Sequence, residues 1–388
     1  MRILVLSQTY TPDREGGAEK IARLAVEGLA RAHEVRVLAL AGSDTPTVHG
    51  VQRLAFRQTP LPGPGGLGKK PGWRKGLWHA ANAVGGVGRR ALGDVVTRFA
   101  PDVIHAHNST AFLPQLGEVA RAQGVPIVWH AHDYGLICAR TTLYRDNRTC
   151  AGACGSCRVL TSRWRQALGG AVSDVIAVSG FLRDRLSREG VLSRARWHVL
   201  HNPIVQVPAA RKRNKGLFTF GFLGALTPEK GIGDLVREFA RLPRGHARLV
   251  VGGQGQAQFL ASLKRAGQGS EIDWLGQVEA EQVYGQADAM VVPSRWDEPF
   301  GLVAGETMAR GLPLIAARRG GLSEQVAGYA GGRLFQPGTG GELYAALVDE
   351  LDRGPRRVSA QSGLSPQVFL AEVERILSRA ATRRLGAA

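Results

Sequence analysis

The chain has 388 residues, 44% of them hydrophobic and 21% charged, and a formal net charge of +18. No apolar run approaches the ~20 residues of a transmembrane helix, and the first apolar run is too short for a signal peptide. These features exclude a membrane-spanning protein and favour a cytoplasmic one. The charge implies an acidic partner, and an anionic membrane surface fits better than nucleic acid because no common nucleic-acid-binding motif is visible.

Two domains of roughly 150–200 residues are expected from this length. The first begins with residues 1–6, an apolar run typical of a buried strand in a parallel sheet. Gly16 and Gly17 then precede a helix with apolar side chains at helical spacing through Ala32. A strand, a glycine pair and a helix start form a loop that a phosphate can approach, although glycine turns are common elsewhere. A second strand follows at 34–40.

Residues 66–100 combine basic side chains with tryptophans, among them Trp73 and Trp78. The basic side chains of this stretch include Lys69, Lys70, Arg74, Lys75, Arg89 and Arg90. Such a stretch suits a helix at a membrane interface, with its rings at the headgroup level and its cations against anionic lipid. A solvated helix whose aromatic rings face inward explains the pattern equally well.

Two further strand patterns, at 101–108 and 126–134, end in histidines. The four histidines are His105, His107, His130 and His132. Four imidazoles at two adjacent strand ends could form a metal site.

All four cysteines lie within twenty residues, with the spacing C-x11-C-x3-C-x2-C. They are Cys138, Cys150, Cys154 and Cys157. In a cytoplasmic protein this clustering indicates a tetrahedral thiolate zinc site rather than disulfides. We expect a structural zinc ion in an insertion at 138–157, outside the core, and four reduced thiols without metal are the alternative.

The first domain is expected to end at residue 204. Residues 205–215 are rich in cations and have no apolar period, so we interpret them as the linker. The second domain, 216–364, begins with a strand and a glycine-containing loop. Ser365 and Pro366 then form an N-cap and first turn that open a last helix within 365–388.

One strand–loop–helix–strand unit stands out between residues 289 and 324. A short apolar run precedes Glu298, and Pro299 and Gly301 shape the turn into a helix. Glu306 is expected about two turns into that helix. The exposed backbone amides at the helix start form an anion site, and they belong to Phe300, Gly301, Leu302 and Val303. Two carboxylates on either side of an anion site predict a sugar nucleotide as the ligand, bound at the carboxyl ends of the strands.

The spacing Glu298-x7-Glu306 is followed by Met-Ala-x-Gly-x-Pro at 308–313 and by Gly-Gly-Leu-x-Glu at 320–324. This series closely resembles the retaining glycosyltransferases of family 4, and Cys138 after His-Asp-Tyr at 132–134 resembles a subgroup of them. The resemblance implies an α/β protein of GT-B fold, with two Rossmann-like domains facing across a cleft and a terminal helix that crosses back to the first domain.

The resemblance also implies the reaction. A sugar would move from a UDP- or GDP-sugar to an acceptor hydroxyl with retention of the anomeric configuration. The acceptor would be lipid-linked or a glycan, in cell-surface polysaccharide or glycolipid assembly at the inner face of the membrane. No Asp-x-Asp motif lies at a strand end, so we expect no catalytic metal, with the diphosphate neutralised by Lys230 and helix-end amides.

Roles carried over from the family fall on matching positions. Gly16 and Gly17 would face the donor diphosphate and the acceptor. His132 would lie near the donor sugar, Glu298 would hold a ring hydroxyl and Glu306 would bind the ribose. Histidines at these strand ends would bind sugars rather than metal, His107 and Asn108 would line a second pocket and His130 would be structural.

One position departs from the family pattern. Ala225 stands where an arginine of the diphosphate clamp is expected, and Arg295 or Arg318 could replace it. This departure fits a first alternative, a catalytically inactive, glycosyltransferase-like partner subunit. The net charge leaves a second one, a basic protein that binds nucleic acid.

Overall fold

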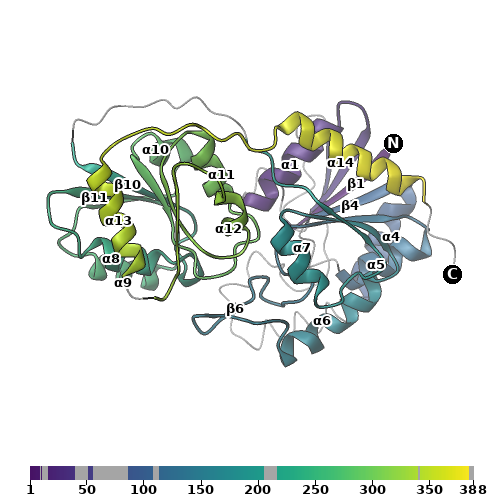
Figure 1. Cartoon of the computed structure of the whole chain (residues 1–388). Helices are drawn as coiled ribbons and strands as arrows, with labels where there is room; N and C mark the ends of the chain where they lie inside the picture. Colours follow the sequence, from purple (N-terminus) through teal and green to yellow (C-terminus); the bar gives the residue numbers. More distant parts are fainter. Residues whose placement is uncertain are drawn as a thin grey trace. The chain divides into compact units, whose positions relative to one another are not determined.

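The computed structural model describes residues 1–8, 10, 16–39, 51–55, 86–107, 113–204, 216–339 and 341–383. The chain divides into two compact units. Unit 1 consists of Met1–Thr142, Gly152–Asn202 and Pro366–Ala388, and unit 2 of Leu143–Ala151 and Pro203–Ser365 (Figure 1). Trp73, Trp78, the linker at 205–215 and Asn108 lie outside the described residues, so the expectations placed on them are not described further here.

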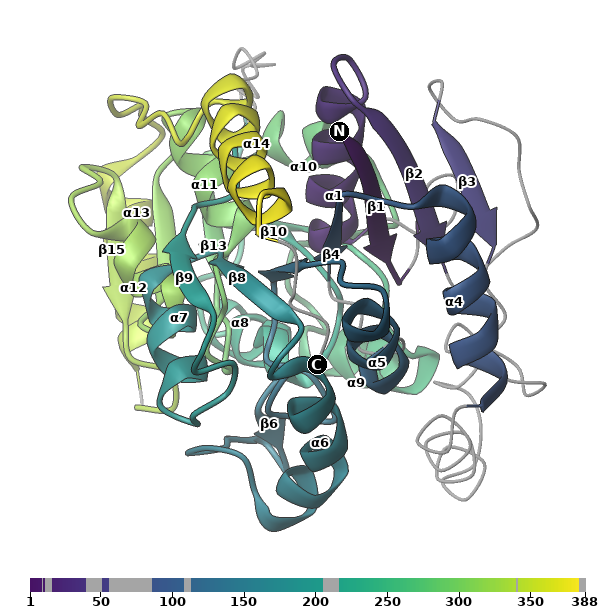
Figure 2. The same cartoon turned by 90° about the vertical axis from the view of Figure 1, so that its right-hand side faces the viewer.

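Unit 1 is built on a seven-stranded parallel sheet in the order β3-β2-β1-β4-β5-β8-β9 (Figure 2). The strands are β1 (Arg2–Ser7), β2 (Glu34–Ala39), β3 (Gln52–Ala55), β4 (Val103–His107), β5 (Ile127–Ala131), β8 (Val172–Ala177) and β9 (Arg196–Val199). The helices are α1 (Gly17–Leu29), α4 (Gly86–Phe99), α5 (Leu113–Ala122), α6 (Gly155–Leu168), α7 (Gly180–Ser187) and α14 (Pro366–Ala381). Every residue of the central strands β4 and β5 is buried, as expected for strands with helices over both faces.

Unit 2 has a six-stranded parallel sheet in the order β12-β11-β10-β13-β14-β15. Its strands are β10 (Phe218–Leu223), β11 (Ala247–Gly252), β12 (Ile272–Gly276), β13 (Ala289–Val292), β14 (Leu314–Ala317) and β15 (Gly332–Phe335). Its helices are α8 (Ile232–Phe239), α9 (Ala257–Ala266), α10 (Ala280–Tyr284), α11 (Leu302–Ala309), α12 (Gly321–Val326) and α13 (Glu342–Arg353), with a 3-10 turn at Pro228–Lys230.

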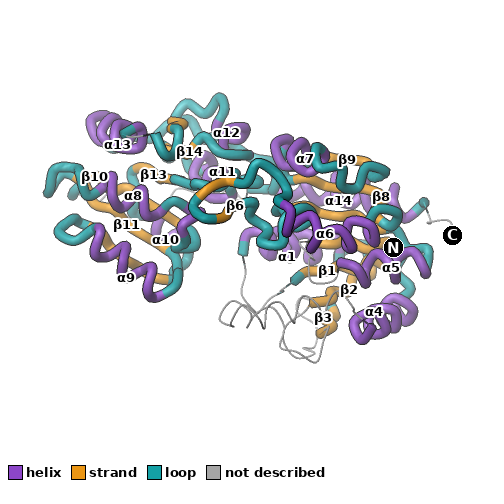
Figure 3. Tube along the Cα trace, turned by 90° about the horizontal axis from the view of Figure 1, so that it is seen from below, coloured by secondary structure: helices purple, strands orange, loops and turns teal. Residues whose placement is uncertain are grey.

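Alternate residues of the strands in unit 2 enter two separate cores. Leu249 and Val291 pack with α8 and α13 on one face of the sheet. Val250 and Met290 pack with α10, α11 and α12 on the other. This alternation, with helices on both sides of the strands, gives three layers (Figure 3).

Both sheets share one connectivity. In each, the chain builds three strands outward from the centre and then returns to build the other half, so the order reverses between β1 and β4 and between β10 and β13. Parallel sheets of this kind bind ligands outside the carboxyl ends of the strands at the reversal. The predicted α/β class with two parallel-sheet domains is confirmed.

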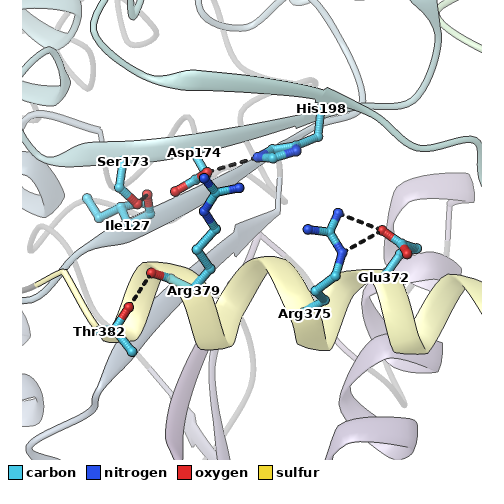
Figure 4. A network of polar contacts seen from close by, with 8 residues as sticks. All are labelled: Ile127, Ser173, Asp174, His198, Glu372, Arg375, Arg379 and Thr382. Carbon is cyan, nitrogen blue, oxygen red and sulfur yellow. Dashed lines mark hydrogen bonds and ion pairs between the residues drawn. The ribbon is translucent and has the colours of Figure 1, made fainter.

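Helix α14 belongs to unit 1, although it follows unit 2 in the sequence. It packs against α1, β4, β5 and β8 and buries Phe369, Val373 and Ile376. Gly28 of α1 permits the close approach, because a Cβ atom there would lie 2.4 Å from a methyl carbon of Leu370. The outer face of the helix is polar, and Arg375 donates a hydrogen bond to Glu372 there (Figure 4). A second polar pair, His198 of β9 and Asp174 of β8, is hydrogen-bonded across the neighbouring strands.

The cysteine segment is divided between the units, which differs from the expected insertion at 138–157 of the first domain. Leu143–Ala151 groups with unit 2. It forms a small hairpin of β6 (Tyr144–Arg145) and β7 (Arg148–Thr149) around Asp146 and Asn147, whose φ angles of 51° and 58° fit a type I′ turn. So short a hairpin has no core of its own. Thr149 Oγ1 donates to the carbonyl oxygen of Arg295 at 3.2 Å.

Candidate functional site

Lys230 and Glu298 meet at the carboxyl edge of the sheet in unit 2. Lys230 ends the turn after β10 and Glu298 lies in the loop after the neighbouring β13. Lys230 Nζ donates to Glu298 Oε1 at 2.7 Å, and Ser294 Oγ donates to the same oxygen at 2.6 Å. Only 7% of the Glu298 side chain is exposed, against 31% for Lys230, so the solvent-facing partner is the cation. Ser294 was missed in the sequence, because nothing there distinguishes it from an ordinary loop serine.

Glycines determine where this pair lies. Gly231 has a φ of 72°, and a Cβ atom there would lie 1.8 Å from the carbonyl oxygen of Pro293. The turn that carries Lys230 therefore packs with its backbone against Pro293, the residue that follows β13. Gly320 and Gly321 pack in the same way against the backbone at Glu298. An added Cβ atom on Gly320 would lie 2.3 Å from the main-chain carbonyl oxygen of Glu298, and one on Gly321 would lie 2.6 Å from that of Pro299. The glycine pair of the sequence motif is thus a backbone support for Glu298.

The start of helix α11 lies directly after Glu298. Gly301 is its N-cap with a φ of 97°, a conformation that favours glycine. The amides of Leu302 and Val303 lie in the first turn, where helical geometry provides no partner within the helix. The Phe300 side chain is 5% exposed and belongs to the interior, so only its backbone is suited to contact a ligand. The predicted anion site is therefore made of main-chain atoms.

Glu306 is the fifth residue of α11 and lies a little over one turn into the helix, not the two turns expected from the sequence. Tyr284 Oη donates to Glu306 Oε2 at 2.7 Å. The guanidinium of Arg310 lies 4.2 Å from the centre of the Tyr284 ring. Burial, and then the neighbouring Glu306, raise the pKa of Tyr284 well above 10, so the phenol stays protonated and donates. No sequence pattern had pointed to this tyrosine.

The structure separates the two candidates for the missing clamp arginine. Arg295 donates from Nε and Nη2 to the two carboxylate oxygens of Asp234, at 2.5 and 2.6 Å. This bidentate pair neutralises its charge, and the hydrogen bond to Asp234 raises the pKa of Arg295. Arg318 follows β14, is exposed and forms no ion pair with a described residue. Arg318 is therefore the better candidate.

In unit 1, Gly16 and Gly17 lie exposed at the start of α1, beside the reversal of the sheet order. The Gly16 amide donates to Glu19 Oε2 at 3.0 Å, so an acidic side chain already binds that amide. Asp133 lies close enough to Glu19 for the two carboxylates to repel each other. Burial chiefly, with Glu19 as a smaller contribution, raises the pKa of Asp133 to about 7. This loop is less suited to an anion than the start of α11.

The four histidines of β4 and β5 lie together. His107 Nδ1 is 3.0 Å from His132 Nε2, His107 Nε2 is 3.3 Å from His105 Nδ1, and His105 Nε2 is 3.4 Å from His130 Nδ1. Burial lowers the pKa of His105 and of His132 to about 3, and burial with the neighbouring rings lowers the pKa of His107 and His130 well below 6.5. The rings are therefore uncharged at neutral pH.

Metal ligation was considered for the histidines and expected for the cysteines. Among the described residues, the three side chains that bring ligand atoms within 4.8 Å of one another are His105, His107 and His130. Five of their six ring nitrogens, however, are paired with other imidazoles, and His130 Nε2 has no hydrogen-bond partner among the described residues. A metal-binding histidine usually gives its second nitrogen to a carboxylate or carbonyl.

The cysteines are only partly gathered. Cys138 Sγ and Cys157 Sγ lie 4.0 Å apart, near the ~3.8 Å that a tetrahedral zinc–thiolate site requires. Cys154 is the N-cap of α6, and hydrogen bonds from Ser156 and Cys157 lower the pKa of its thiol to about 7. Burial raises the pKa of Cys157 to about 11. Cys150 belongs to unit 2.

No described helix has both the length and the apolar character needed to cross a membrane. Two family models match the chain. Residues 15–205 match a model described as Glycosyltransferase Family 4, and residues 206–360 match one described as Glycosyl transferases group 1. The boundary between the two matches falls at the start of the segment that we interpret as the linker.

Similar proteins include a glycogen synthase of Mycobacterium tuberculosis, which is 29% identical over 372 residues, 91% of this chain and 86% of that protein. Among solved structures, Anabaena Alr3699/HepE in complex with UDP-glucose has a TM-score of 0.71 at 19% identity, covering 98% of this chain and 100% of that one. WaaG, a glycosyltransferase involved in lipopolysaccharide biosynthesis, has a TM-score of 0.66 at 15% identity, covering 99% and 100%.

Proposed function

We propose that this chain, a glycosyltransferase of GT-B fold similar to family 4, transfers a sugar from a nucleotide-diphosphate sugar to an acceptor hydroxyl and retains the anomeric configuration. The observation that carries the proposal is the pairing of Lys230 with Glu298 beside the start of α11. A cation, a carboxylate and a helix start therefore lie next to one another at one sheet edge, and they suit the phosphates and the sugar of such a donor.

The diphosphate is bound by Lys230 and the amides at the start of α11. A helix start carries about half a positive charge and offers N–H groups, which together suit a phosphate oxygen. Arg318 supplies a further cation in place of the clamp arginine, because Ala225 stands at the position where that arginine is expected. With these groups the leaving diphosphate needs no divalent metal ion.

The nucleoside and the sugar are bound on opposite sides of that anion site. Glu306, held by Tyr284, accepts hydrogen bonds from the ribose, as expected from the family resemblance. Glu298 holds a hydroxyl of the donor sugar, and its present bond to Lys230 is exchanged when phosphate draws the ammonium away. The uncharged His132 of unit 1 forms a hydrogen bond near the reacting carbon. Gly16 and Gly17 lie on the acceptor side.

The acceptor is a growing glycan or a lipid-linked sugar, in polysaccharide or glycolipid assembly. The similar glycogen synthase and the lipopolysaccharide enzyme WaaG support these two classes. The net charge of +18 suits an anionic membrane face at which a lipid-linked acceptor is reached. Helix α6 adds to this, because Val159 is 74% and Leu160 50% exposed next to the exposed cations Arg158 and Arg163.

The cysteines hold one structural zinc ion in this proposal, as in the subgroup with His-Asp-Tyr followed by Cys138. The separation of Cys138 and Cys157 and the acidic thiol of Cys154 fit thiolate ligands. The ion would fix the loop that follows His132 and would take no part in the reaction.

A donor panel tests the function. Thermal unfolding is measured with UDP-, GDP- and ADP-sugars and with the free sugars, because a ligand that binds the native state raises its stability. One nucleotide class should raise the melting temperature, with or without EDTA. The same donor, incubated with glycan and lipid-linked acceptors, should give a product whose anomeric proton shows retention.

A catalytically inactive partner subunit is the second candidate, favoured by Ala225 in the clamp. Donor binding without transfer to any acceptor, in the presence of the full panel, would support that candidate over the enzyme. No donor binding at all would contradict both.

The membrane partner is tested by flotation. The chain should float with vesicles that contain an anionic lipid and stay behind with neutral ones, since each cation near the surface contributes about 1 kcal/mol. Trp73→Ala with Trp78→Ala tests the first basic stretch, and Val159→Asp tests α6. Equal binding to neutral and anionic vesicles would contradict an electrostatic membrane partner.

A further inference from the structure

Arg295 lies in the loop between β13 and α11 and binds three other segments of unit 2. Its amide donates to the carbonyl oxygen of Glu229 at 2.9 Å. Its guanidinium donates to both carboxylate oxygens of Asp234, at 2.5 and 2.6 Å. Its own carbonyl oxygen accepts a hydrogen bond from Thr149 Oγ1 at 3.2 Å. The main chain and the side chain of Arg295 are therefore both engaged by the protein.

The first two contacts lie on either side of Lys230 in the sequence. Glu229 precedes Lys230 directly, and Asp234 follows it in the first turn of α8. The Glu229 carbonyl oxygen also accepts from the amide of Trp296 at 3.3 Å, and Lys230 Nζ lies 5.0 Å from the centre of the Trp296 ring. The turn that carries Lys230 is therefore fixed on both sides by the loop that carries Glu298.

The third contact comes from the hairpin of β6 and β7, which groups with unit 2. Tyr144 and Thr149 are paired with each other across this hairpin. The Thr149 hydroxyl binds the Arg295 carbonyl oxygen, and Tyr144 adds a smaller contribution than Asp234 to the raised pKa of Arg295. Because so short a hairpin has no core of its own, this attachment holds the hairpin and the loop to each other.

The bond between Lys230 and Glu298 depends on such support. The two residues are 68 positions apart in the sequence, so local chain structure alone cannot hold their side chains at 2.7 Å. Under the proposed function they contact the diphosphate and the sugar of one donor, and a displacement of about 1 Å can cost about 100-fold in rate. A forked arginine–carboxylate pair such as that of Arg295 and Asp234 adds geometric specificity as well as energy.

We propose that Arg295 is a positioning residue that holds Lys230 and Glu298 in their relative positions. Asp234 and Thr149 support it from α8 and from the hairpin. The effect on catalysis rests on the proposed function, whereas the relative position of the two side chains does not. The competing role for Arg295 is that of a phosphate ligand in place of the clamp arginine.

The two roles predict opposite effects of a substitution at Asp234. A phosphate ligand would be released when Asp234 loses its charge, so donor binding would tighten. A positioning residue would lose its anchor, so the rate would fall. Lysine at position 295 separates the roles as well, because it keeps the charge but cannot form two parallel hydrogen bonds to a carboxylate.

Steady-state kinetics and calorimetry of the full chain measure these effects. Asp234→Asn and Arg295→Lys should each lower kcat about tenfold and change the nucleotide Kd less than about threefold, because Glu306 and Tyr284 bind the nucleoside elsewhere on the sheet edge. Tighter donor binding in Asp234→Asn, or full kcat in Arg295→Lys, would overturn the proposal. If Arg295→Lys does not fold, Asp234→Asn decides alone.

A double variant and two controls sharpen the kinetic test. Asp234→Asn combined with Arg295→Lys should lose about as much as either single variant, because both remove one contact, whereas independent effects would multiply to about 100-fold. A 100-fold loss would overturn the proposal. Glu238→Gln is the matched control, since Glu238 lies on the same helix, is 24% exposed and pairs with Arg241. Arg237→Gln removes the exposed second cation at Asp234 and should also leave kcat unchanged.

Competitive acetylation of lysines with acetic anhydride, followed by mass spectrometry, gives a readout that needs no donor. Lys230 should react more slowly than the exposed Lys264 of α9, because Glu298 holds its amine and 31% of its side chain is exposed. Asp234→Asn and Arg295→Lys should each raise the ratio of Lys230 to Lys264 labelling about threefold, and Glu238→Gln should not. An unchanged ratio in both variants would overturn the proposal.

Thr149 tests the support from the hairpin. Thr149→Val removes the hydroxyl and keeps the shape of the side chain, so kcat should fall about threefold, the size of one neutral hydrogen bond. Thr149→Ser keeps the hydroxyl and should recover the rate. Equal rates in Thr149→Val and the wild type would remove the hairpin from the proposal.

The two readouts also distinguish this role from the proposed function. If no donor supports transfer but the labelling ratio responds to Asp234→Asn, the proposed function fails and the positioning of Lys230 by Arg295 stands. If transfer occurs and neither kcat nor the labelling ratio responds, only the positioning role fails.

Discussion

Beside the reversal of strand order in unit 1, four uncharged imidazoles lie buried on β4 and β5 and directly after β5. At the same reversal in unit 2, between β10 and β13, the polar groups include a lysine–glutamate ion pair and the backbone amides at the start of helix α11. Depth explains the difference. The histidines lie in the middle of the sheet under α14, where burial makes charge costly, whereas Lys230 keeps 31% of its side chain exposed.

The two sheets have the same strand order but place different polar groups at its reversal. Uncharged donors discriminate hydroxyl groups without attracting ions, and charged groups with a helix start bind phosphate. Under the proposed function, the same strand order would serve two kinds of ligand group, according to how deep the polar side chains lie. The following predictions test this contrast, beginning with the largest expected effect.

Acid should destabilise unit 1 through its histidines. Their folded pKa values lie below the unfolded 6.5, so the unfolded chain binds more protons below pH 6.5 and stability falls as the pH falls. Asp133 opposes this, because its folded pKa of about 7 exceeds its unfolded value and the folded chain holds that extra proton. Each proton is worth about 1.4 kcal/mol per pH unit, so His105 and His132 alone exceed Asp133 by one proton, and stability should fall by about 1.4 kcal/mol or more per unit as the pH drops toward 5.5.

Urea unfolding at pH 7.5, 6.5 and 5.5 measures this slope. His105→Gln should reduce it by about one proton, and His246→Gln, at an exposed position in unit 2, should leave it unchanged. Stability that is flat or rises toward pH 5.5 would contradict the uncharged state of the histidines.

Loss of the cation should be the largest single effect in unit 2. Lys230→Ala removes the group that neutralises the diphosphate, and removal of one such donor typically lowers kcat about 100-fold or more. It also leaves the buried Glu298 with Ser294 as its remaining side-chain donor. Steady-state kinetics measure the effect, with Lys264→Ala on the exposed face of α9 as the control. A loss of less than threefold would mean that the diphosphate lies elsewhere.

Glu306 and Tyr284 test the nucleoside side of the same sheet edge. Glu306→Ala should weaken donor binding about tenfold, the size of one hydrogen bond to a charged group. Tyr284→Phe should weaken it about fivefold, because Glu306 loses the phenol that fixes its carboxylate. Calorimetry with the preferred nucleotide measures both, and Tyr344→Phe on α13 is the control. Unchanged affinity in Glu306→Ala would remove this residue from the site.

The cysteine segment tests how firmly the loop after His132 is held. About one zinc ion per chain is expected by elemental analysis of protein purified without chelators. Cys154→Ser should lower stability and activity but leave the nucleotide preference unchanged, and Ser162→Ala, an exposed position on α6, is the control. Four freely titrating thiols with no stoichiometric metal would end the zinc hypothesis.

Much of the architecture follows from local patterns in the sequence. Apolar runs such as Val103–Ala106 and Ala289–Val292 become buried parallel strands, and Gly301 and Gly320 occupy positive-φ positions at helix starts. Glu298, Lys230 and Glu306 could be selected from spacing and resemblance alone. These features depend on a few neighbouring residues, so they can be predicted from the sequence.

Other features depend on residues that are distant in sequence, and only the tertiary structure decides them. Ser294 and Lys230 converge on one oxygen of Glu298, Tyr284 reaches Glu306 from another helix, and Asp234 engages Arg295 and leaves Arg318 for the clamp. The sequence likewise shows four histidines but not their order of contact. His105 and His107 are in contact along β4, whereas the contacts of His130 with His105 and of His132 with His107 cross between strands, so spacing within a strand and packing between strands determine the order together.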